Sequence, residues 1–279
     1  MSVLHAGSHR LSLARPLVMG IVNVTPDSFS DGGRLDDAQA AIRHALTLQE
    51  AGADILDIGG ESTRPGAAAV PADEEMRRVL PVIKALASRG CVVSVDTMKP
   101  EVMQVALDAG AAMVNDVMAL RAPGALEAVA ASDAAVCLMH MQGEPQRMQL
   151  SPHYVDVVEE VKRFLQGRVV ACEGAGISRE RLVIDPGFGF GKTLDHNLAL
   201  LSHLYHLAEL GLPVLAGLSR KSMLGSLTGR EVDEREFAGI AAHLAAVARG
   251  ARLLRVHNVA AMRDALAIWN AVEEQQDGT

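Results

Sequence analysis

The chain has 279 residues, of which 49% are hydrophobic, 22% are charged and 3% are aromatic, and its formal net charge is −8. This composition is that of a globular protein, and a chain of this length buries enough surface to fold without disulfides or a structural metal. Because the chain is acidic and has no run of Lys and Arg residues, neither nucleic acid nor an anionic membrane is expected as a partner. The apolar stretches are shorter than the ~20 residues of a membrane span. The three cysteines form no CxxC pair, which favours a cytoplasmic location, and no signal peptide is predicted.

One unit recurs along the chain: a short aliphatic run that ends in a polar residue, then a loop, then a helical pattern. The aliphatic runs are continuous and do not alternate with polar residues, which indicates strands buried on both faces, as in a parallel sheet. In chain order the predicted strands are Leu17–Val22, Ile55–Ile58, Cys91–Val95, Ala112–Val114, Ala135–Met139, Leu182–Ile184, Val214–Leu218 and Leu253–Val256. Alternation of this kind over roughly 250 residues predicts an α/β protein with a single (β/α)8 TIM barrel. A doubly wound open sheet is the alternative.

The segments between the predicted strands have helical periodicity. Val157, Val161 and Leu165, for example, recur on one helical face. Glycines stand where these helices should end, at Gly52, Gly110, Gly211 and Gly250. No change in composition divides the chain, so we expect residues 1–279 to form one domain, with residues 1–15 and 273–279 as frayed ends.

Polar residues lie at or just after the ends of the predicted strands, where (β/α)8 barrels carry their active sites. They are Asn23, Glu61, Asp96, Asn115, Asp185, Lys221, Arg255 and His257. Any one of the Asn and Asp residues has an alternative role as the cap of the following helix, but together the polar residues indicate one shared cavity. Asp96, Asn115 and Asp185 offer acceptors for a planar heterocycle with adjacent N–H donors, such as a 2-amino-4-oxo pyrimidine ring.

The last two predicted strands point to an anionic substrate. The segment GLSRKS (217–222) follows the seventh strand and RVH (255–257) ends the eighth, which is where this fold commonly binds phosphate. The segment DPGFGFGKT (185–193) is not a P-loop, because Pro186 stands where the first glycine is required. We interpret it as a tight loop that lets the backbone approach a ligand, with Phe188 and Phe190 as apolar walls.

Taken together, the motifs resemble those of the dihydropteroate synthase family. In order they are MGIVNVTPDSFSDGG (19–33), DIGGESTRPG (57–66), SVDT (94–97), ND (115–116), MHMQG (139–143), DPGFGFGK (185–192), GLSRKS (217–222) and RVH (255–257). Members of this family are (β/α)8 barrels of folate biosynthesis that join 4-aminobenzoate to a dihydropterin methyl diphosphate and release diphosphate. The resemblance therefore implies a transferase with small-molecule substrates, Mg²⁺ as cofactor and a homodimeric assembly.

The resemblance also implies roles for individual residues. For pterin diphosphate these are Thr63, Asp96, Asn115, Asp185, Lys221, Arg255 and His257, with Asn23 at the diphosphate and as the Mg²⁺ ligand. For 4-aminobenzoate they are Phe29, Thr63, Pro65, Phe190 and Ser222, and the residues implied in catalysis are Lys221, Arg255, His257 and Arg64. In the family's mechanism diphosphate leaves before the amine attacks. We expect Thr25–Leu35 and Thr63–Ala69 to act as lids that exclude water.

Two other functions would use the same pterin-binding residues. One is methyl transfer from a methyl-tetrahydrofolate to a corrinoid protein, and the segments 62–65 and 217–221 favour the synthase over it. The other is a pterin-binding paralogue without catalysis, which would bind pterin but not turn over 4-aminobenzoate. One position departs from the family: Asn258 stands where an Asp often follows the histidine of the last strand. Because Asn caps a helix about as well as Asp, we expect little consequence.

Overall fold

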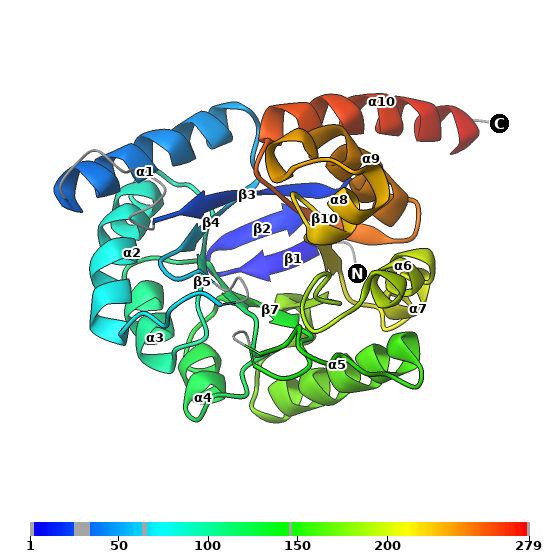
Figure 1. Cartoon of the computed structure of the whole chain (residues 1–279). Coiled ribbons are helices and arrows are strands. Elements are labelled where there is room, and N and C mark those ends of the chain that lie inside the picture. Colours follow the sequence, from blue (N-terminus) through cyan, green and yellow to red (C-terminus); the bar gives the residue numbers. More distant parts are fainter. Residues whose placement is uncertain (1–2, 25–33, 63–65, 145–146, 278–279) are drawn as a thin grey trace.

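A closed parallel barrel forms the centre of the protein, in a computed structural model that describes residues 3–24, 34–62, 66–144 and 147–277 (Figure 1). The strands follow chain order around the barrel, and the last pairs with the first, with Leu254 opposite Val18. This closure confirms the (β/α)8 prediction and rules out the open sheet. The barrel strands are β3 (Leu17–Asn23), β4 (Ile55–Gly59), β5 (Val93–Asp96), β6 (Met113–Asp116), β7 (Ala135–Met139), β8 (Leu182–Asp185), β9 (Val214–Ala216) and β10 (Ala251–Val256).

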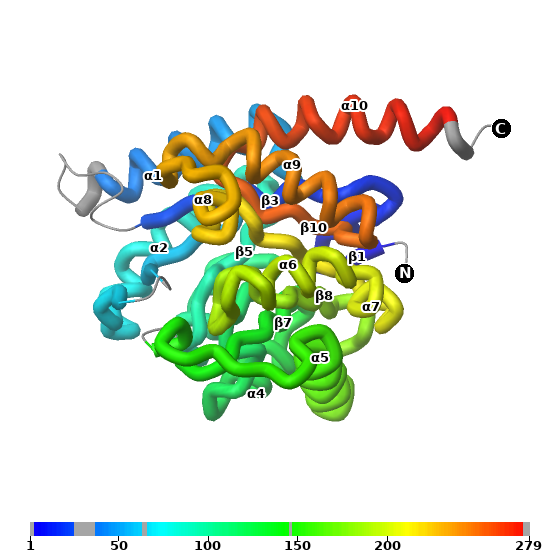
Figure 2. The backbone as a smooth tube through the Cα atoms, turned by 45° about the vertical axis from the view of Figure 1, so that its right-hand side comes forward, coloured from blue at the N-terminus to red at the C-terminus, as the bar shows by residue number. Residues whose placement is uncertain are grey.

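Helices surround the barrel on its outer side, and Figure 2 shows the last of them lying along α9 at the top of the view. They are α1 (Arg34–Glu50), α2 (Ala72–Ala87), α3 (Pro100–Asp108), α4 (Ala125–Ala130), α5 (Val157–Gly174), α6 (Leu194–Ser202), α7 (Tyr205–Ala208), α8 (Ser222–Thr228), α9 (Glu236–Val247) and α10 (Val259–Asp277). Short 3₁₀ turns occupy Arg179–Arg181 and Val232–Glu234. The four glycines expected at helix ends all have positive φ, from 72° at Gly211 to 103° at Gly110, which is the left-handed conformation that ends helices.

The strands read as continuous apolar runs because both of their faces are buried. Along β3, Val18 and Val22 face outward and pack beneath the helices, while Leu17 and Met19 face inward. The inward residues at the strand starts form a dry cluster inside the barrel. Polar inward residues are therefore concentrated toward the C-terminal ends of the strands, and this is where a site can form.

The N-terminal segment is ordered, and the expectation that residues 1–15 are frayed is wrong for the part described. An antiparallel hairpin of β1 (Val3–Ala6) and β2 (His9–Ser12) lies across the end of the barrel where the strands begin (Figure 1). Leu4 is fully buried against the inward-facing cluster, and the amide of Gly7 donates to the carbonyl of Asp133 at 2.9 Å. The hairpin thus covers apolar surface that would otherwise face water.

The C-terminal end, which was likewise predicted to be frayed, is largely helical. Helix α10 continues to Asp277, so most of the range 273–279 extends the last helix. Glu273, Glu274 and Gln275 in this last stretch are exposed. Their polar composition therefore reflects the solvent-facing end of a helix.

Candidate active site

The floor of the barrel mouth is built around the guanidinium of Arg255 on β10. Its Nε donates to Oδ2 of Asp57 at 2.6 Å, and its Nη2 donates to Oδ2 of Asp96 at 2.7 Å. The amide of Asn115 donates to the same Asp57 oxygen at 3.2 Å. The structure thus brings Asp96, Asn115 and Arg255 together as the sequence predicted. Asp57, which is fully buried between them, was not among the predicted site residues.

Burial shapes the charges on this floor. Desolvation raises the pKa of Asp96 to about 7, although the guanidinium of Arg255 opposes that shift. Burial alone would lower the pKa of Arg255, but the carboxylates of Asp57 and Asp96 outweigh burial and raise this pKa above its usual value. Arg255 therefore stays charged, and it fixes the carboxyl group of Asp96, which can accept hydrogen bonds from a ring rich in N–H groups.

A second group of predicted residues meets on the loop that follows β8. Oδ1 of Asp185 accepts from the amide of Gly187 at 2.7 Å, and burial raises the pKa of this carboxyl group. The ammonium of Lys221 lies 4.1 Å from the centre of the Phe190 ring, which is a cation–π distance. Lys221 and Phe190, predicted for different substrates, are therefore in contact.

Phe188 does not line the cavity, so that part of the prediction is wrong. Its side chain is 1% exposed and belongs to the main core beneath the helices. The positive φ of Gly187 and Gly189, 68° and 79°, bends the loop on either side of it. The sequence shows two phenylalanines in one loop, but it does not show that the bends between them direct the rings to different environments.

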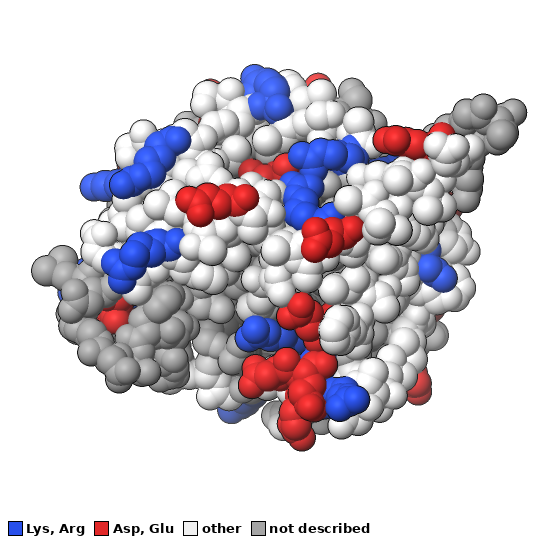
Figure 3. All heavy atoms as spheres, turned by 90° about the horizontal axis from the view of Figure 1, so that it is seen from above, with Lys and Arg blue, Asp and Glu red and all other residues white. Residues whose placement is uncertain are grey.

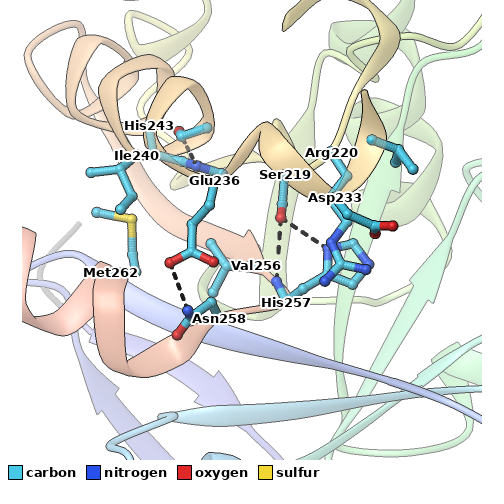
Figure 4. A pocket seen from close by; sticks show the side chains of 12 residues that line it. Ser219, Arg220, Asp233, Glu236, Ile240, His243, Val256, His257, Asn258 and Met262 are labelled. Carbon is cyan, nitrogen blue, oxygen red and sulfur yellow. Dashed lines mark hydrogen bonds between the residues drawn. The ribbon is translucent and has the colours of Figure 1, made fainter. Parts of the chain in front are cut away.

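The ends of β9 and β10 are joined through a serine that was not among the predicted site residues. Oγ of Ser219 and Nδ1 of His257 are 2.9 Å apart, and the His257 amide donates to the same oxygen at 3.4 Å (Figure 4). Arg220, between Ser219 and Lys221, has a φ of 60°, an uncommon conformation for a residue with a side chain. This turn therefore places the Ser219 hydroxyl against the His257 ring, and Arg220 lines the same pocket.

Asn23 and Ser222 lie at the ends of their elements. Asn23 ends β3 and is partly buried, and Oδ1 of Asn23 lies 3.8 Å from the position of a Cβ built on Gly59. The same Cβ position lies 3.6 Å from Cβ of Asp96, so the glycine leaves open the space between the two polar side chains. Ser222 is exposed at the first position of α8.

Four predicted site residues lie outside the described residues, and so do residues 25–33 and 63–65 of the two predicted lids. The four site residues are Phe29, Thr63, Arg64 and Pro65.

Comparison with known proteins agrees with this geometry. The family described as "Pterin binding enzyme" matches residues 19–257. A dihydropteroate synthase of Neisseria meningitidis serogroup C is 52% identical over 275 residues, which cover 97% of each chain. The chain belongs to the dihydropteroate synthase family of pterin-binding enzymes. A second relative with this name, from Escherichia coli K12, is 49% identical over 96% of this chain and 95% of its own.

Solved structures of the dihydropteroate synthase family share the whole fold. That of Xanthomonas albilineans with 4-aminobenzoic acid superposes with a TM-score of 0.92 at 59% identity and covers 98% of both chains. That of Burkholderia cenocepacia complexed with 7,8-dihydropteroate gives a TM-score of 0.91 at 48% identity, and it covers 100% of this chain and 99% of its own. The likeness therefore extends over the whole barrel.

Asn258, the departure from the family's pattern, makes two contacts. Its side-chain oxygen accepts from the amide of Ala261 at 3.1 Å, as expected of a helix cap. Its side-chain nitrogen donates to Oε1 of Glu236 at 2.8 Å, which links the start of α10 to that of α9 (Figure 4). An aspartate here would cap the helix but would face Glu236 with a second carboxylate. Asn258 therefore avoids the repulsion that an aspartate would meet beside Glu236.

The pocket in Figure 4 includes a buried histidine that contacts the segment after β9. His243 on α9 is 1% exposed, its Nδ1 is 2.7 Å from the carbonyl of Gly239, and its Nε2 accepts from the amide of Leu218 at 3.3 Å. Burial lowers the pKa of His243 to about 4. The neutral ring thus anchors the segment that leads into Ser219 and Lys221.

Because His243 is buried in its neutral form, we expect the protein to lose stability in mild acid. Below pH 6.5 the unfolded chain binds a proton at His243 that the folded chain does not bind until about pH 4, so the free energy of unfolding falls as the pH drops through that window. At pH 4 this proton uptake lowers the free energy of unfolding by about 3 kcal/mol. Urea unfolding of the wild type and of His243→Gln at pH 7 and pH 4.5 should show a smaller loss in the variant. Equal losses would contradict the assignment, and the more exposed His206→Gln serves as the control.

Proposed function

We propose that this chain is a dihydropteroate synthase that condenses (7,8-dihydropterin-6-yl)methyl diphosphate with 4-aminobenzoate and releases diphosphate. The observation that carries the proposal is the acceptor-rich floor of the barrel mouth, where Arg255 holds Asp57 and Asp96 beside Asn115. Such a floor suits the N–H groups of a pterin ring. Relatives with the same fold have been solved with 4-aminobenzoic acid and with 7,8-dihydropteroate.

In this mechanism the side chains act on two ends of one substrate. Asp96, Asn115 and Asp185 hold the pterin ring, while Lys221, Arg255 and His257 neutralise charge on the departing diphosphate. The bond from the methylene carbon to the diphosphate oxygen breaks first, and the electron pair leaves with the oxygen. The amine of 4-aminobenzoate then bonds to the carbon and loses a proton. Thr63, Arg64 and Pro65, with Phe29, Phe190 and Ser222, are the proposed contacts of 4-aminobenzoate and the closing loop.

Synthesis of dihydropteroate by the purified protein tests this proposal. Wild-type protein should form product from both substrates, and Asp96→Asn should lose most of the turnover because one acceptor becomes a donor. Pterin diphosphate binding without product would favour the non-catalytic paralogue. Methyl transfer from methyl-tetrahydrofolate to a corrinoid protein, without dihydropteroate formation, would favour the methyltransferase.

Mg²⁺ is the proposed cofactor, with Asn23 as its protein ligand. The amide oxygen of Asn23 faces the open space over Gly59 near Asp96, and oxygen ligands are what Mg²⁺ prefers. Among the residues that the structure places, no cluster of three or more His, Cys, Asp or Glu residues is arranged to hold a metal. One amide is nevertheless sufficient, because protein-bound Mg²⁺ commonly keeps waters and takes oxygens from a substrate diphosphate. The ion would supply positive charge at that leaving group.

Metal removal gives a direct check. Activity should disappear in a chelator and return with added Mg²⁺. In Asn23→Ala the Mg²⁺ concentration for half-maximal activity should rise about tenfold, which corresponds to the loss of roughly 1.4 kcal/mol of binding free energy. Full activity in the chelator would contradict the proposal, and Asn270→Ala on α10 serves as a matched control.

A second copy of this chain is the proposed macromolecular partner. Helices α8, α9 and α10 expose large apolar side chains, including Phe237 at 84%, Ile268 at 71% and Leu227 at 56%, and exposed apolar groups of this size are typical of interfaces. Other apolar residues of α9 and α10, namely Leu244, Val247 and Leu266, pack against the barrel core. Sedimentation velocity should show a dimer that dissociates in the Phe237→Asp/Ile268→Asp variant. A monomeric wild type would contradict the proposal.

The proposed location is the cytoplasm. All three cysteines, Cys91, Cys137 and Cys172, are free and buried, as is usual where thiols stay reduced. No helix in the described part of the chain is long and apolar enough to cross a membrane. The face seen in Figure 3 carries both signs of charge interspersed, so that face offers no continuous basic surface for nucleic acid.

A further inference from the structure

A buried lysine lies at the foot of the loop between β8 and α6, and the proposed mechanism does not use it. Lys192 is 3% exposed, and its ammonium donates to the carbonyls of Gly187 at 3.0 Å and Phe190 at 2.9 Å. It also lies 3.0 Å from Nδ1 of His140 at the end of β7. With the carbonyl of His140 as a longer contact at 3.4 Å, these acceptors can take all three protons of an ammonium group. The loop is therefore wound around Nζ of Lys192.

The surrounding protein holds the same loop on its other sides. The amide of Gly189 donates to Oδ1 of Asn197 at 2.7 Å, and the hydroxyl of Tyr154 donates to the carbonyl of Gly191 at 2.8 Å. A Cβ built on Gly187 would lie only 2.0 Å from the carbonyl oxygen of His140. Each of these contacts fixes the backbone, so the loop is a rigid support.

The outer side of the loop contacts the site. The carbonyl of Phe190 accepts a hydrogen bond from Lys192. The face of its ring contacts the ammonium of Lys221, which is 4.1 Å from the ring centre. A Cβ built on Gly189 would lie 3.1 Å from Cδ of Lys221, so the stem of that lysine lies directly on the loop. One backbone turn thus separates a buried lysine from a lysine of the site.

We propose that Lys192 is a positioning residue, whose buried ammonium holds residues 187–191 in the conformation that sets the Phe190 ring against Lys221. The kinetic consequence of this role rests on the proposed function, because Phe190 there contacts 4-aminobenzoate. The position of the Phe190 ring itself is independent of any activity.

His140 provides a reporter for the same contact. Burial and the charge of Lys192 lower the pKa of His140 to about 3, so the ring is neutral, and its Nδ1 accepts from the lysine. Burial also lowers the pKa of Lys192 to about 7, while Asp185 opposes and Lys221 adds to that shift. The imidazole of His140 should therefore keep its proton on Nε2.

The test compares the wild type with Lys192→Met, which keeps the length of the side chain and removes the ammonium. We expect the KM for 4-aminobenzoate to rise at least tenfold, and the Kd for pterin diphosphate to change by a smaller factor, because Phe190 lies on the loop itself while Lys221 only rests on it. Lys162→Met, which breaks a pair with Glu209 on the surface, should change neither constant. A folded Lys192→Met protein with wild-type constants would overturn the proposal.

NMR separates this proposal from the proposed function. In the wild type the Phe190 ring should shift the side-chain protons of Lys221 upfield, and Lys192→Met should abolish that shift even if the protein forms no dihydropteroate. The pKa of His140 should rise in the same variant. If Lys192→Met does not fold, Tyr154→Phe removes one support of the same loop and should reduce the upfield shift. An unchanged shift in the folded variant would contradict the positioning role.

Discussion

Replacing Arg255 by methionine is expected to abolish dihydropteroate formation and to destabilise the protein. The change leaves Asp57, fully buried, and Asp96 without their shared cation. Loss of one partner from a buried ion pair typically costs about 3–5 kcal/mol, because the remaining charge is neither hydrated nor paired. Turnover should fall by at least roughly 10³-fold, since a charge that stabilises the leaving diphosphate is also lost. Urea unfolding and product formation measure the two effects.

Two further variants separate stability from catalysis at this position. In Arg255→Met/Asp57→Asn one uncompensated carboxylate is removed, so part of the stability should return while turnover stays absent. In Arg255→Lys the positive charge remains, but an ammonium lacks the fork that joins Asp57 to Asp96, so we expect intermediate values of both quantities. Wild-type stability and turnover in Arg255→Met would contradict the role of this floor.

The sequence predicts the barrel and much of its mouth because both follow from local patterns. Continuous apolar runs identify the strands, and the polar residue that ends each run falls at the C-terminal edge of the sheet. Thus Asp96, Asn115 and Arg255, which come from three strands, were expected in one cavity and lie within one hydrogen-bonded group.

The parts that were not predicted depend on contacts between distant segments. Asp57 stands inside the apolar run of β4 and not at its end, so a search for polar residues at strand ends misses it. An isolated aspartate within a buried strand was nevertheless a usable signal, because such a charge needs a partner. The N-terminal hairpin was missed because its strands are only four residues long and gain their burial from the barrel cluster. Lys192 and His140 are 52 residues apart, and no local pattern pairs them.

Replacing Lys99 by methionine is the second change for which we expect a large effect. The ammonium of Lys99, just after β5, pairs with the carboxylates of Glu61 and Glu75. The side chain of Glu75 is fully buried and that of Glu61 is 7% exposed. Burial alone would lower the pKa of Lys99, but its bonds to the two glutamates raise it, so the lysine stays charged. Without it, two buried carboxylates lose their cation, and the free energy of unfolding should fall by about 4 kcal/mol.

This prediction depends on burial, and surface pairs provide the contrast. Lys162→Met breaks the pair with Glu209, whose side chain is 54% exposed, so water screens the charge that remains and the urea midpoint should barely move. Neutralising the partners in Lys99→Met/Glu61→Gln/Glu75→Gln should restore much of the lost stability, because no unpaired charge is then buried. Oε1 of Glu61 also accepts from the amide of Val70 at 3.0 Å, a bond that a glutamine can keep through its carbonyl oxygen. If Lys99→Met moves the midpoint as little as Lys162→Met does, the buried ion pairs do not stabilise the fold as argued.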